Sequence, residues 1–597
     1  MKNRLRIFVL AALFIMLSGE AVPAGKQSRP KVGVVTYSGN ITYQDSRLEG
    51  LMLTRPSRFL ATNRFHPEIF KDDMETLTAF YRQNGFLQAS IVDTLVSVDS
   101  IKNRVDISIV IEEGARTFVE GVTVFGNSFF ADSVLTRHFG IGKGDPLRRP
   151  VIEDDVVMLL SLYAEQGFLD ASVTPNVQVN DSAHLALVDF SLNEGVRSRV
   201  GEINIIGAVK SRPSVILREL SLAPGDTIRY SELINSQQRL YLTGLFESVF
   251  VRPAPSVAGD STERDIRIEV KEKLSSELSF SIGYGTIEKA RGRIELNTSN
   301  LGGTARKAGI GAEASFIKQG VSMSFSEPWT LGTRWKTDLS VFGQLRQEPA
   351  YHAETIGGKL TVGRKLGLKT TVSLSYRLEN TNFSRIDLTV PVEESDPRIR
   401  SLTLAISHDT RDNLFDPSAG WYVDWSAELA GSFLQGSNTF ARSVLILKRF
   451  QPLDRNTVIG SALEIGWMES FGENEEIPLS ERFYTGGPTS LRGFRYQMVG
   501  PVDTNGEPLG GRFKLVWNIA ELRRSIYRMV GGALFVEFGN VWSNPRMARL
   551  ADLRLNLGSG LRLNSPLGIL RLDFGINADR RPGEPRVKMF VSMGQAF

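Results

Sequence analysis

The stretch GGPTSLRGFRY, residues 486–496, places Arg492 beside a glycine and between large apolar residues. A guanidinium group can bind a carboxylate through two parallel hydrogen bonds, which a lysine ammonium cannot copy. No histidine or carboxylate lies within ten residues of Arg492, so its sequence neighbours offer no catalytic partner. Arg492 is therefore either an exposed turn residue that contributes almost nothing, or half of an ion pair whose partner lies far along the chain.

Enzymatic chemistry finds little support elsewhere in the sequence. There is no cysteine, which excludes disulfides, cysteine-zinc sites and thiol nucleophiles. The stretch GIGKGD, residues 140–145, lacks the full phosphate-loop pattern. No metal-site spacing occurs among the five histidines, His66, His138, His184, His352 and His408. The sequence predicts no enzyme, no metal and no cofactor.

The first 24 residues have the pattern of a secretory signal peptide. A basic start, MKNRLR, precedes eleven apolar residues at Ile7–Leu17, and small residues allow cleavage near Ala24. The alternative, an anchoring helix, is disfavoured because this run is too short to span a bilayer stably. The formal charge of +4 shows no basic excess of the kind that nucleic acid requires.

A motif recurs through the first half with a period near 80 residues. LTAFYRQNGFLQAS (77–90) is repeated as LLSLYAEQGFLDAS (159–172), and a weaker third copy surrounds Gly244. This period is too long for one solenoid unit, so each copy is expected to be a small domain. The expected boundaries are 30–116, 117–197 and 198–273.

Each copy has the same predicted order of elements. In the first, apolar residues at spacings of four, three and four predict one face of a helix, from Phe70 to Tyr81. Pro67 stands at the helix start and Gly85 just past its end. With the extended runs around it, the order is strand, helix, helix, strand, strand, which suits a small sheet covered by helices on one face. The helix of the third copy has the weakest apolar spacing.

From Leu274 onward, period-two alternation replaces helical spacing. TTVSLSYRLEN, for example, places Leu374 and Leu378 on one face and Arg377 and Glu379 on the other. An apolar outer face and a wet lumen are what a membrane barrel requires, although a soluble sandwich also alternates. The signal peptide and the terminal aromatic residue favour the barrel. Residues 274–597 have room for about 16 spanning strands.

Several motifs resemble those of one known family. The recurring GN, Y…GF and EEG or NEG signatures resemble POTRA domains. The barrel signatures resemble those of the BamA/TamA family of outer-membrane assembly proteins, and they occur in family order: FSEPW, DTRDNLFDPSAGW, TGGPTSLRGF, FVEFGNVW and GQAF. The resemblance covers nearly all of the chain after the signal peptide, and three POTRA units resemble the layout of TamA most. Gln595 departs from the apolar residue common at that place in outer-membrane proteins.

The resemblance also implies roles for the residues around Arg492. In the family this arginine lies on a long loop that folds back into the barrel and meets acidic residues of the inner wall. The matching acidic residues here are Glu537 and Glu521. Gly493 would let the loop backbone approach the wall, and Phe494 would pack the loop tip.

A weak seam between the first and last strands is the second implied site. The first strand is expected near Leu278–Tyr284 and the last at Val587–Phe597. An incoming strand could pair at the opened edge, and glycines would loosen the seam. The expected seam residues are Gly283, Gly285, Gly594 and Phe597.

The function implied is insertion of proteins into the outer membrane, or export of their domains. POTRA units in the periplasm would receive unfolded outer-membrane protein or autotransporter clients, partly by adding them to a sheet edge. Accessory subunits, either lipoproteins or periplasm-spanning proteins, and outer-membrane lipid are further expected partners. The alternatives are a two-partner-type secretion pore for one dedicated substrate, and a barrel enzyme such as a lipase.

Overall fold

The computed structural model of the chain describes residues 29–57, 63–255, 262–389, 396–471, 476–565 and 568–597. The signal peptide expected at residues 1–24 lies outside the described residues. The chain forms two compact units, of which the first comprises Met1–Asn204, Ser221–Ser236 and Val251–Arg267. The second comprises Ile205–Leu220, Gln237–Phe250 and Ile268–Phe597. In the described part, no helix is both long and apolar enough to cross a bilayer.

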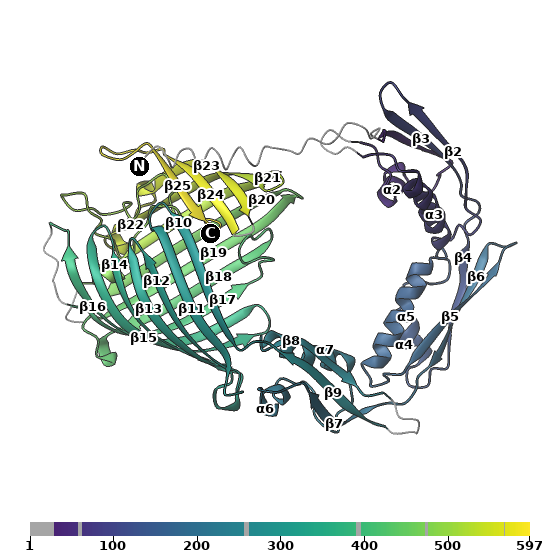
Figure 1. The fold of residues 1–597 in the computed structure, drawn as a ribbon, viewed down its shortest axis with the longest axis horizontal. Helices are drawn as coiled ribbons and strands as arrows, with labels where there is room; N and C mark the ends of the chain where they lie inside the picture. Colours follow the sequence, from purple (N-terminus) through teal and green to yellow (C-terminus); the bar gives the residue numbers. More distant parts are fainter. Residues whose placement is uncertain (1–28, 58–62, 256–261, 390–395, 472–475, 566–567) are drawn as a thin grey trace. The chain divides into compact units, whose positions relative to one another are not determined.

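The first repeat is a three-stranded sheet covered by helices (Figure 1). In chain order its elements are β1 (Lys31–Ser38), α2 (Asp45–Leu51), α3 (Pro67–Gln83), β2 (Ser90–Asp99) and β3 (Arg104–Glu112). Strand β3 lies in the centre, parallel to β1 and antiparallel to β2. The expected helix face is confirmed, because Phe70, Leu77 and Tyr81 are buried in the core of this repeat.

The second and third repeats have the same order of elements and the same sheet topology. The second consists of β4 (Phe118–Phe125), α4 (Asp132–Thr136), α5 (Arg149–Ala164), β5 (Ser172–Asn180) and β6 (Leu185–Asn193). The third consists of β7 (Arg199–Ile206), α6 (Pro213–Leu217), α7 (Tyr230–Leu242), β8 (Phe246–Pro253) and β9 (Glu263–Glu272). The helix with the weakest sequence pattern, α7, forms because Leu233 and Leu240 still reach a buried position.

A carboxylate at the end of the central strand explains why EEG and NEG recur. Glu194 accepts the backbone N–H of Phe129 at 2.8 Å and of Ser128 at 2.7 Å. Glu113 accepts from Thr42 in the first repeat at 3.0 Å. Burial alone would raise the pKa of the Glu194 carboxyl, but these backbone donors lower its pKa below the usual range. The motif thus fixes the turn that follows the first strand.

The rest of the described chain forms one antiparallel sheet of sixteen strands in sequence order (Figure 1). The first eight are β10 (Ser276–Gly285), β11 (Lys289–Leu301), β12 (Arg306–Ser315), β13 (Lys318–Glu327), β14 (Lys336–Gln347), β15 (Tyr351–Leu366), β16 (Thr370–Ile386) and β17 (Arg398–Asp409). The last eight are β18 (Gly420–Ala430), β19 (Phe440–Asp454), β20 (Thr457–Ser470), β21 (Phe513–Tyr527), β22 (Val530–Trp542), β23 (Arg554–Ser565), β24 (Gly568–Asn577) and β25 (Val587–Met593).

The alternation predicted from the sequence sets the two faces of this sheet. In β16, Leu374 and Leu378 are exposed on the outer face, whereas Arg377 and Glu379 form hydrogen bonds inside. A sandwich would need two sheets packed face to face, and sixteen consecutive strands in one sheet form a barrel instead. The fold class predicted from the sequence is confirmed.

The connection between β20 and β21 is the part of the barrel that matters most for the site. Successive strands run in opposite directions, so this connection lies at the rim opposite the one at which β10 begins. Residues 476–512 of this connection are called the lumenal loop below. Leu479, Leu491, Phe494 and Val499 of this loop are at most 2% exposed, so the loop is folded into the barrel interior.

Candidate functional site

Arg492 lies in the lumenal loop, is fully buried, and forms ion pairs with the barrel wall. Its Nε donates to Oε1 of Glu537 at 2.8 Å, and its backbone N–H donates to Oε2 of the same residue at 2.8 Å. Its Nη2 donates to Glu521 at 2.6 Å. The structure therefore brings together the three residues that the family resemblance paired, and the alternative of an exposed turn arginine is wrong.

A third wall carboxylate and three further arginines complete this site. Asp573 on β24 accepts from Nη1 of Arg492 at 3.5 Å and from Arg562 at 2.7 Å. The sequence analysis missed Asp573, although the alternation of LRLDFGIN could have revealed it, because Leu570 and Phe574 face outward. The group is called the tip cluster, and it consists of Arg492, Glu521, Arg523, Glu537, Arg562, Arg571 and Asp573.

The residues next to Arg492 allow the loop to press against the wall. A Cβ atom at position 493 would collide with the side chain of Asn556, so Gly493 is required for this approach. The guanidinium of Arg492 lies 3.3 Å from the centroid of the Phe535 ring. Phe494 is 2% exposed and packs with Leu491 and Val499, in agreement with its expected packing role.

A second cluster of charges holds the lumenal loop nearer its start, and the sequence analysis did not anticipate it. Glu481 accepts from Nη1 and Nη2 of Arg377 on β16 at 3.1 and 3.0 Å. Arg442 on β19 contacts Glu481 at 3.1 Å and also pairs with Glu428 on β18. The group is called the stem cluster, and it consists of Arg377, Glu379, Glu428, Arg442 and Glu481.

Arg377 uses every N–H bond of its guanidinium in the stem cluster. Nε donates to Ser401, Nη1 donates to Glu379 and Glu481, and Nη2 donates to Glu428 and Glu481. A guanidinium has five such donors and a lysine ammonium has only three. The position therefore requires arginine in the same way as position 492.

Apolar and neutral contacts fix the rest of the loop. Ile477 is buried in a cluster with Phe440 and Met468, and Leu479 in another with Tyr351. Further along, Gln497 donates to Glu348 at 3.0 Å. The loop is thus attached to several strands of the wall, from β15 to β24.

The seam between β10 and β25 contrasts with the continuous wall. Ten residue pairs join β10 to β11. Across the seam, the hydrogen bonds among described residues involve a single pair, with Thr286 N–H donating to the Val591 carbonyl at 3.0 Å and Val591 N–H donating to the Thr286 hydroxyl at 2.7 Å. Gly283 and Gly285 lie in β10 as expected, paired with β11. The open side of β10 is a free sheet edge over most of its length.

The last residues correct the predicted extent of the final strand. Strand β25 ends at Met593, and Gly594 has a φ of +84°, which turns the chain out of the wall. Phe597 lies away from the seam, stacked on Phe450 of β19 with ring centroids 6.0 Å apart. Phe597 is therefore not a seam residue, and Gln595 donates to Asp416 at 2.9 Å instead of lying in the strand.

Comparison with known families agrees with this architecture. A model described as the Omp85 superfamily domain matches residues 300–597. The POTRA model, described as a surface antigen variable number repeat, matches residues 30–114, 117–195 and 198–273. The chain is a POTRA-bearing member of the Omp85 superfamily.

Several similar proteins carry the name BamA. The chain is 25% identical to the outer membrane protein assembly factor BamA of Nitratidesulfovibrio vulgaris, over 91% of this chain and 69% of that protein. It is 25% identical to BamA of Neisseria meningitidis serogroup B, over 95% of this chain and 78% of that protein. A crystal structure of BamA from Haemophilus ducreyi lacking POTRA domains 1–3 has the same fold, with a TM-score of 0.68, 19% identity, and coverage of 80% and 99% of the two chains.

Proposed function

We propose that this Omp85 member assembles and inserts other β-barrel proteins into the outer membrane. Its barrel lies in that membrane, and its POTRA repeats lie in the periplasm, where they receive unfolded clients. The proposal draws on the relatives named BamA and on the seam described above. It requires no cofactor and no catalytic step, because strand pairing itself supplies the free energy.

The observation that carries the proposal is the free edge of β10. A strand without a neighbour presents a row of backbone N–H and C=O groups that another chain can pair with. Among the described residues, opening the seam removes only the hydrogen bonds between Thr286 and Val591. An incoming client strand that pairs along β10 would form several hydrogen bonds in exchange, each contributing roughly 1 kcal/mol. Strand addition at β10 is therefore favourable.

The two glycines of β10 assist this exchange. Gly285 has only the Val591 carbonyl near the place of a Cβ atom, at 3.8 Å, so space remains on that side for another backbone. Gly283 leaves a gap that the side chain of Arg291 fills. We propose that these positions keep β10 deformable, while the lumenal loop keeps the wall from β15 to β24 in place.

The finer assignments belong to the same proposal. Cleavage of a signal peptide near Ala24 would release the chain into the periplasm. Accessory lipoproteins or periplasm-spanning subunits would bind the POTRA repeats, and outer-membrane lipid would surround the barrel. Clients would include autotransporters as well as other outer-membrane barrels. A layout with three POTRA units fits a specialist of the TamA type as well as a general insertase.

A disulfide across the seam tests the proposal. The chain has no cysteine of its own, so Thr286→Cys with Val591→Cys creates a single cysteine pair at the position where the described residues form hydrogen bonds across the seam. In proteoliposomes given a urea-unfolded eight-stranded outer-membrane barrel, the oxidised variant should insert almost none, and reduction should restore insertion. The matched control, Ser324→Cys with Ser340→Cys, joins directly opposed residues of β13 and β14 and should leave insertion unchanged. Full insertion by the oxidised seam variant would contradict the proposal.

A further inference from the structure

The first two repeats present the same sheet edge to solvent, but the two edges differ in one backbone group. Strands β2 and β5 are edge strands, each paired within the described chain only with the central strand of its own sheet. The opposite edges are covered in part: Val32 donates to the carbonyl of Asn63 and Val119 to the carbonyl of Asp145. Strands β2 and β5 are thus the edges to which another chain could be added.

The register of the first repeat shows which backbone groups of β2 point outward. Lys31 donates to the carbonyl of Asn103, so odd-numbered residues of the following strand β3 face β1. Backbone groups alternate along a strand, so even-numbered residues of β3 bind β2. Thr94 lies opposite Ile109, an odd-numbered residue, and its own N–H and C=O therefore point to the open side. Its N–H meets only the side chain of the adjacent Asp93, at 2.8 Å.

The same reasoning applies to the second repeat and gives a different result. Phe118 donates to the carbonyl of His184, so even-numbered residues of β6 face β4. Pro175 lies opposite Phe190, and its backbone nitrogen therefore points to the open side of β5. Proline has no N–H to donate, so the outer edge of β5 lacks a donor at its centre.

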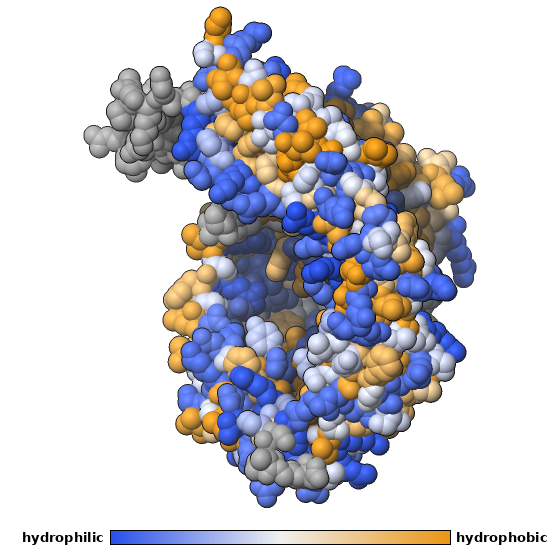
Figure 2. Space-filling view, turned by 90° about the vertical axis from the view of Figure 1, so that its right-hand side faces the viewer, coloured by the Kyte–Doolittle hydropathy of each residue, from blue (hydrophilic) through white to orange (hydrophobic). Residues whose placement is uncertain are grey.

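Thr94 and Pro175 occupy equivalent positions, 81 residues apart, in the two copies. The edge of β2 is also more apolar, with Val92, Leu95 and Val98 each more than half exposed. Figure 2 shows apolar side chains among hydrophilic ones over the first repeat, at the top of the view. On β5, by contrast, Val179 is 38% exposed.

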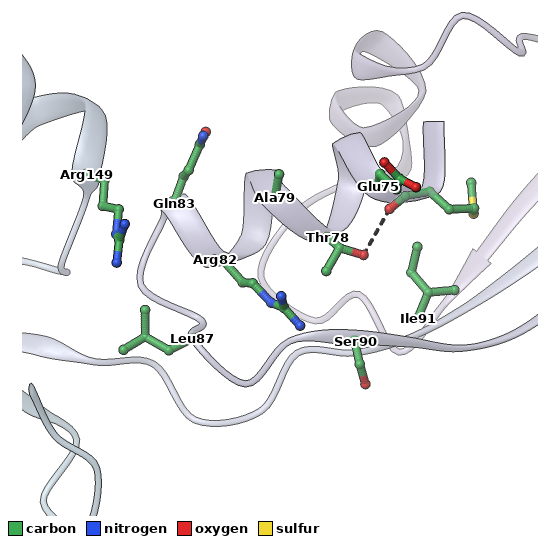
Figure 3. A pocket seen from close by; sticks show the side chains of 10 residues that line it. Glu75, Thr78, Ala79, Arg82, Gln83, Leu87, Ser90, Ile91 and Arg149 are labelled. Atoms are coloured by element: carbon green, nitrogen blue, oxygen red, sulfur yellow. Dashed lines mark hydrogen bonds between the residues drawn. The ribbon is translucent and has the colours of Figure 1, made fainter. Parts of the chain in front are cut away.

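A groove runs beside the open edge of β2. It lies between α3 and the start of β2, with a volume of about 760 Å³. Figure 3 shows Thr78 and Arg82 on α3, and Ser90 and Ile91 where β2 begins. Apolar side chains line it together with Arg82 and Arg149, against one carboxylate, Glu75. A side chain of a strand added to β2 would have beside it a groove of mixed apolar and polar lining that carries two arginines.

We propose that, of the first two repeats, the first accepts an added strand, and that Pro175 closes the equivalent edge of the second. The occupant is an extended segment of an unfolded outer-membrane barrel, with apolar residues at alternate positions. Only an extended chain can pair with the outward N–H and C=O groups of Thr94, Val96 and Val98. The inference rests on the proposed function for the identity of this partner, while the division between the repeats follows from their register.

Substitutions at Thr94 and Pro175 test this difference between the repeats. They leave the hydrogen bonds between the strands of each sheet unchanged, because both backbone nitrogens point to the open side. Thr94→Pro removes an N–H that no neighbouring strand uses, and Pro175→Thr restores the donor to β5. A photo-crosslinking residue replaces either Ser97 on β2 or Gln178 on β5. Both residues are exposed, and they occupy equivalent positions 81 residues apart in the two repeats. Each full-length variant, in detergent micelles, receives a urea-unfolded eight-stranded outer-membrane barrel, and the yield of the crosslinked product is measured.

Crosslinking at position 97 should exceed that at position 178 by at least about fivefold, the effect of one net hydrogen bond. Thr94→Pro should lower the yield at position 97 by a similar factor, whereas Thr94→Ser, which keeps the N–H, should not. Pro175→Thr should raise the yield at position 178, a gain that misfolding cannot produce. Equal yields at the two positions in the parent, or no response to either exchange, would overturn the proposal. Because this assay needs no insertion, its failure is distinct from failure of the seam experiment.

Discussion

The tip cluster and the stem cluster both hold the lumenal loop, but the loop residue is positively charged at the tip and negatively charged at the stem. At the tip, the loop supplies the arginine and the wall supplies Glu521, Glu537 and Asp573. At the stem, the loop supplies Glu481 and the wall supplies arginines. A loop placed the other way round would bring like charges together, so the two clusters fix its direction as well as its position.

The two clusters also differ in what remains when the loop residue is lost. Without the Arg492 side chain, Glu537 has no cation and keeps only neutral donors, which are the amides of Asn518 and Asn556 and the backbone N–H of residue 492. Without Glu481, Arg377 still pairs with Glu379 and Glu428. An isolated buried charge is far less stable than a charge with partners left. The tip should therefore be the more sensitive of the two.

The largest expected effect comes from breaking the tip. Arg492→Ala should lower the free energy of unfolding by about 3–5 kcal/mol, because it leaves Glu537 unpaired in a buried site. Arg492→Lys should be nearly as harmful, since lysine cannot reach three carboxylates in one plane. Urea unfolding in micelles, followed by tryptophan fluorescence, measures the change, and insertion in proteoliposomes should fall in parallel. A lysine variant as stable and active as the parent would contradict the paired geometry.

Breaking the stem should have a smaller effect. Glu481→Ala should lower the same free energy by about 2 kcal/mol, because Arg377 loses two of its five hydrogen bonds but keeps two carboxylates. Glu476→Ala, in the exposed start of the loop, is the matched control and should change the free energy by less than about 0.5 kcal/mol. If Glu481→Ala proved as harmful as Arg492→Ala, the difference between the clusters would disappear.

An uncharged change at the tip separates packing from charge. Phe494→Leu keeps an apolar residue in the cluster of Leu491 and Val499 and removes only part of its volume. It should lower the free energy of unfolding by about 1 kcal/mol, measured as above. A loss comparable to that of Arg492→Ala would show that packing, and not the ion pairs, dominates at the tip.

The smallest effect is the coupling between the clusters. They share no residue, so the double variant Arg492→Ala with Glu481→Ala should show the sum of the single effects to within about 0.5 kcal/mol. A double-mutant cycle in urea measures this term. Coupling well above that value would mean that the loop is placed as one unit instead of at two separate points.

The sequence predicted the tip cluster but not the stem cluster. The tip was found because LRGF is a specific family signature and its acidic partners match by position. The stem was missed because Glu481 and Arg377 belong to no such signature and lie 104 residues apart. Alternation in β16 already placed Arg377 on the inner face, but nothing local told which loop residue it would meet.

The terminal strand shows the same limit. Alternation from Val587 to Phe597 predicted one continuous strand at the seam. The chain instead leaves the wall at Gly594, because the Phe597 ring stacks on Phe450, a residue of β19 far away in the sequence. The favourable contact for an aromatic ring was one that only the closed barrel provides.

The sequence by itself determined the repeats, a barrel of about sixteen strands and the inward or outward direction of side chains in the strands that alternate clearly, because these depend on spacing between near neighbours. The tertiary structure alone decided which inward charges meet, where the final strand ends, and that Pro175 faces the open side of its sheet. Those features depend on register and barrel closure, which join residues far apart in the chain and leave no periodic signal along it.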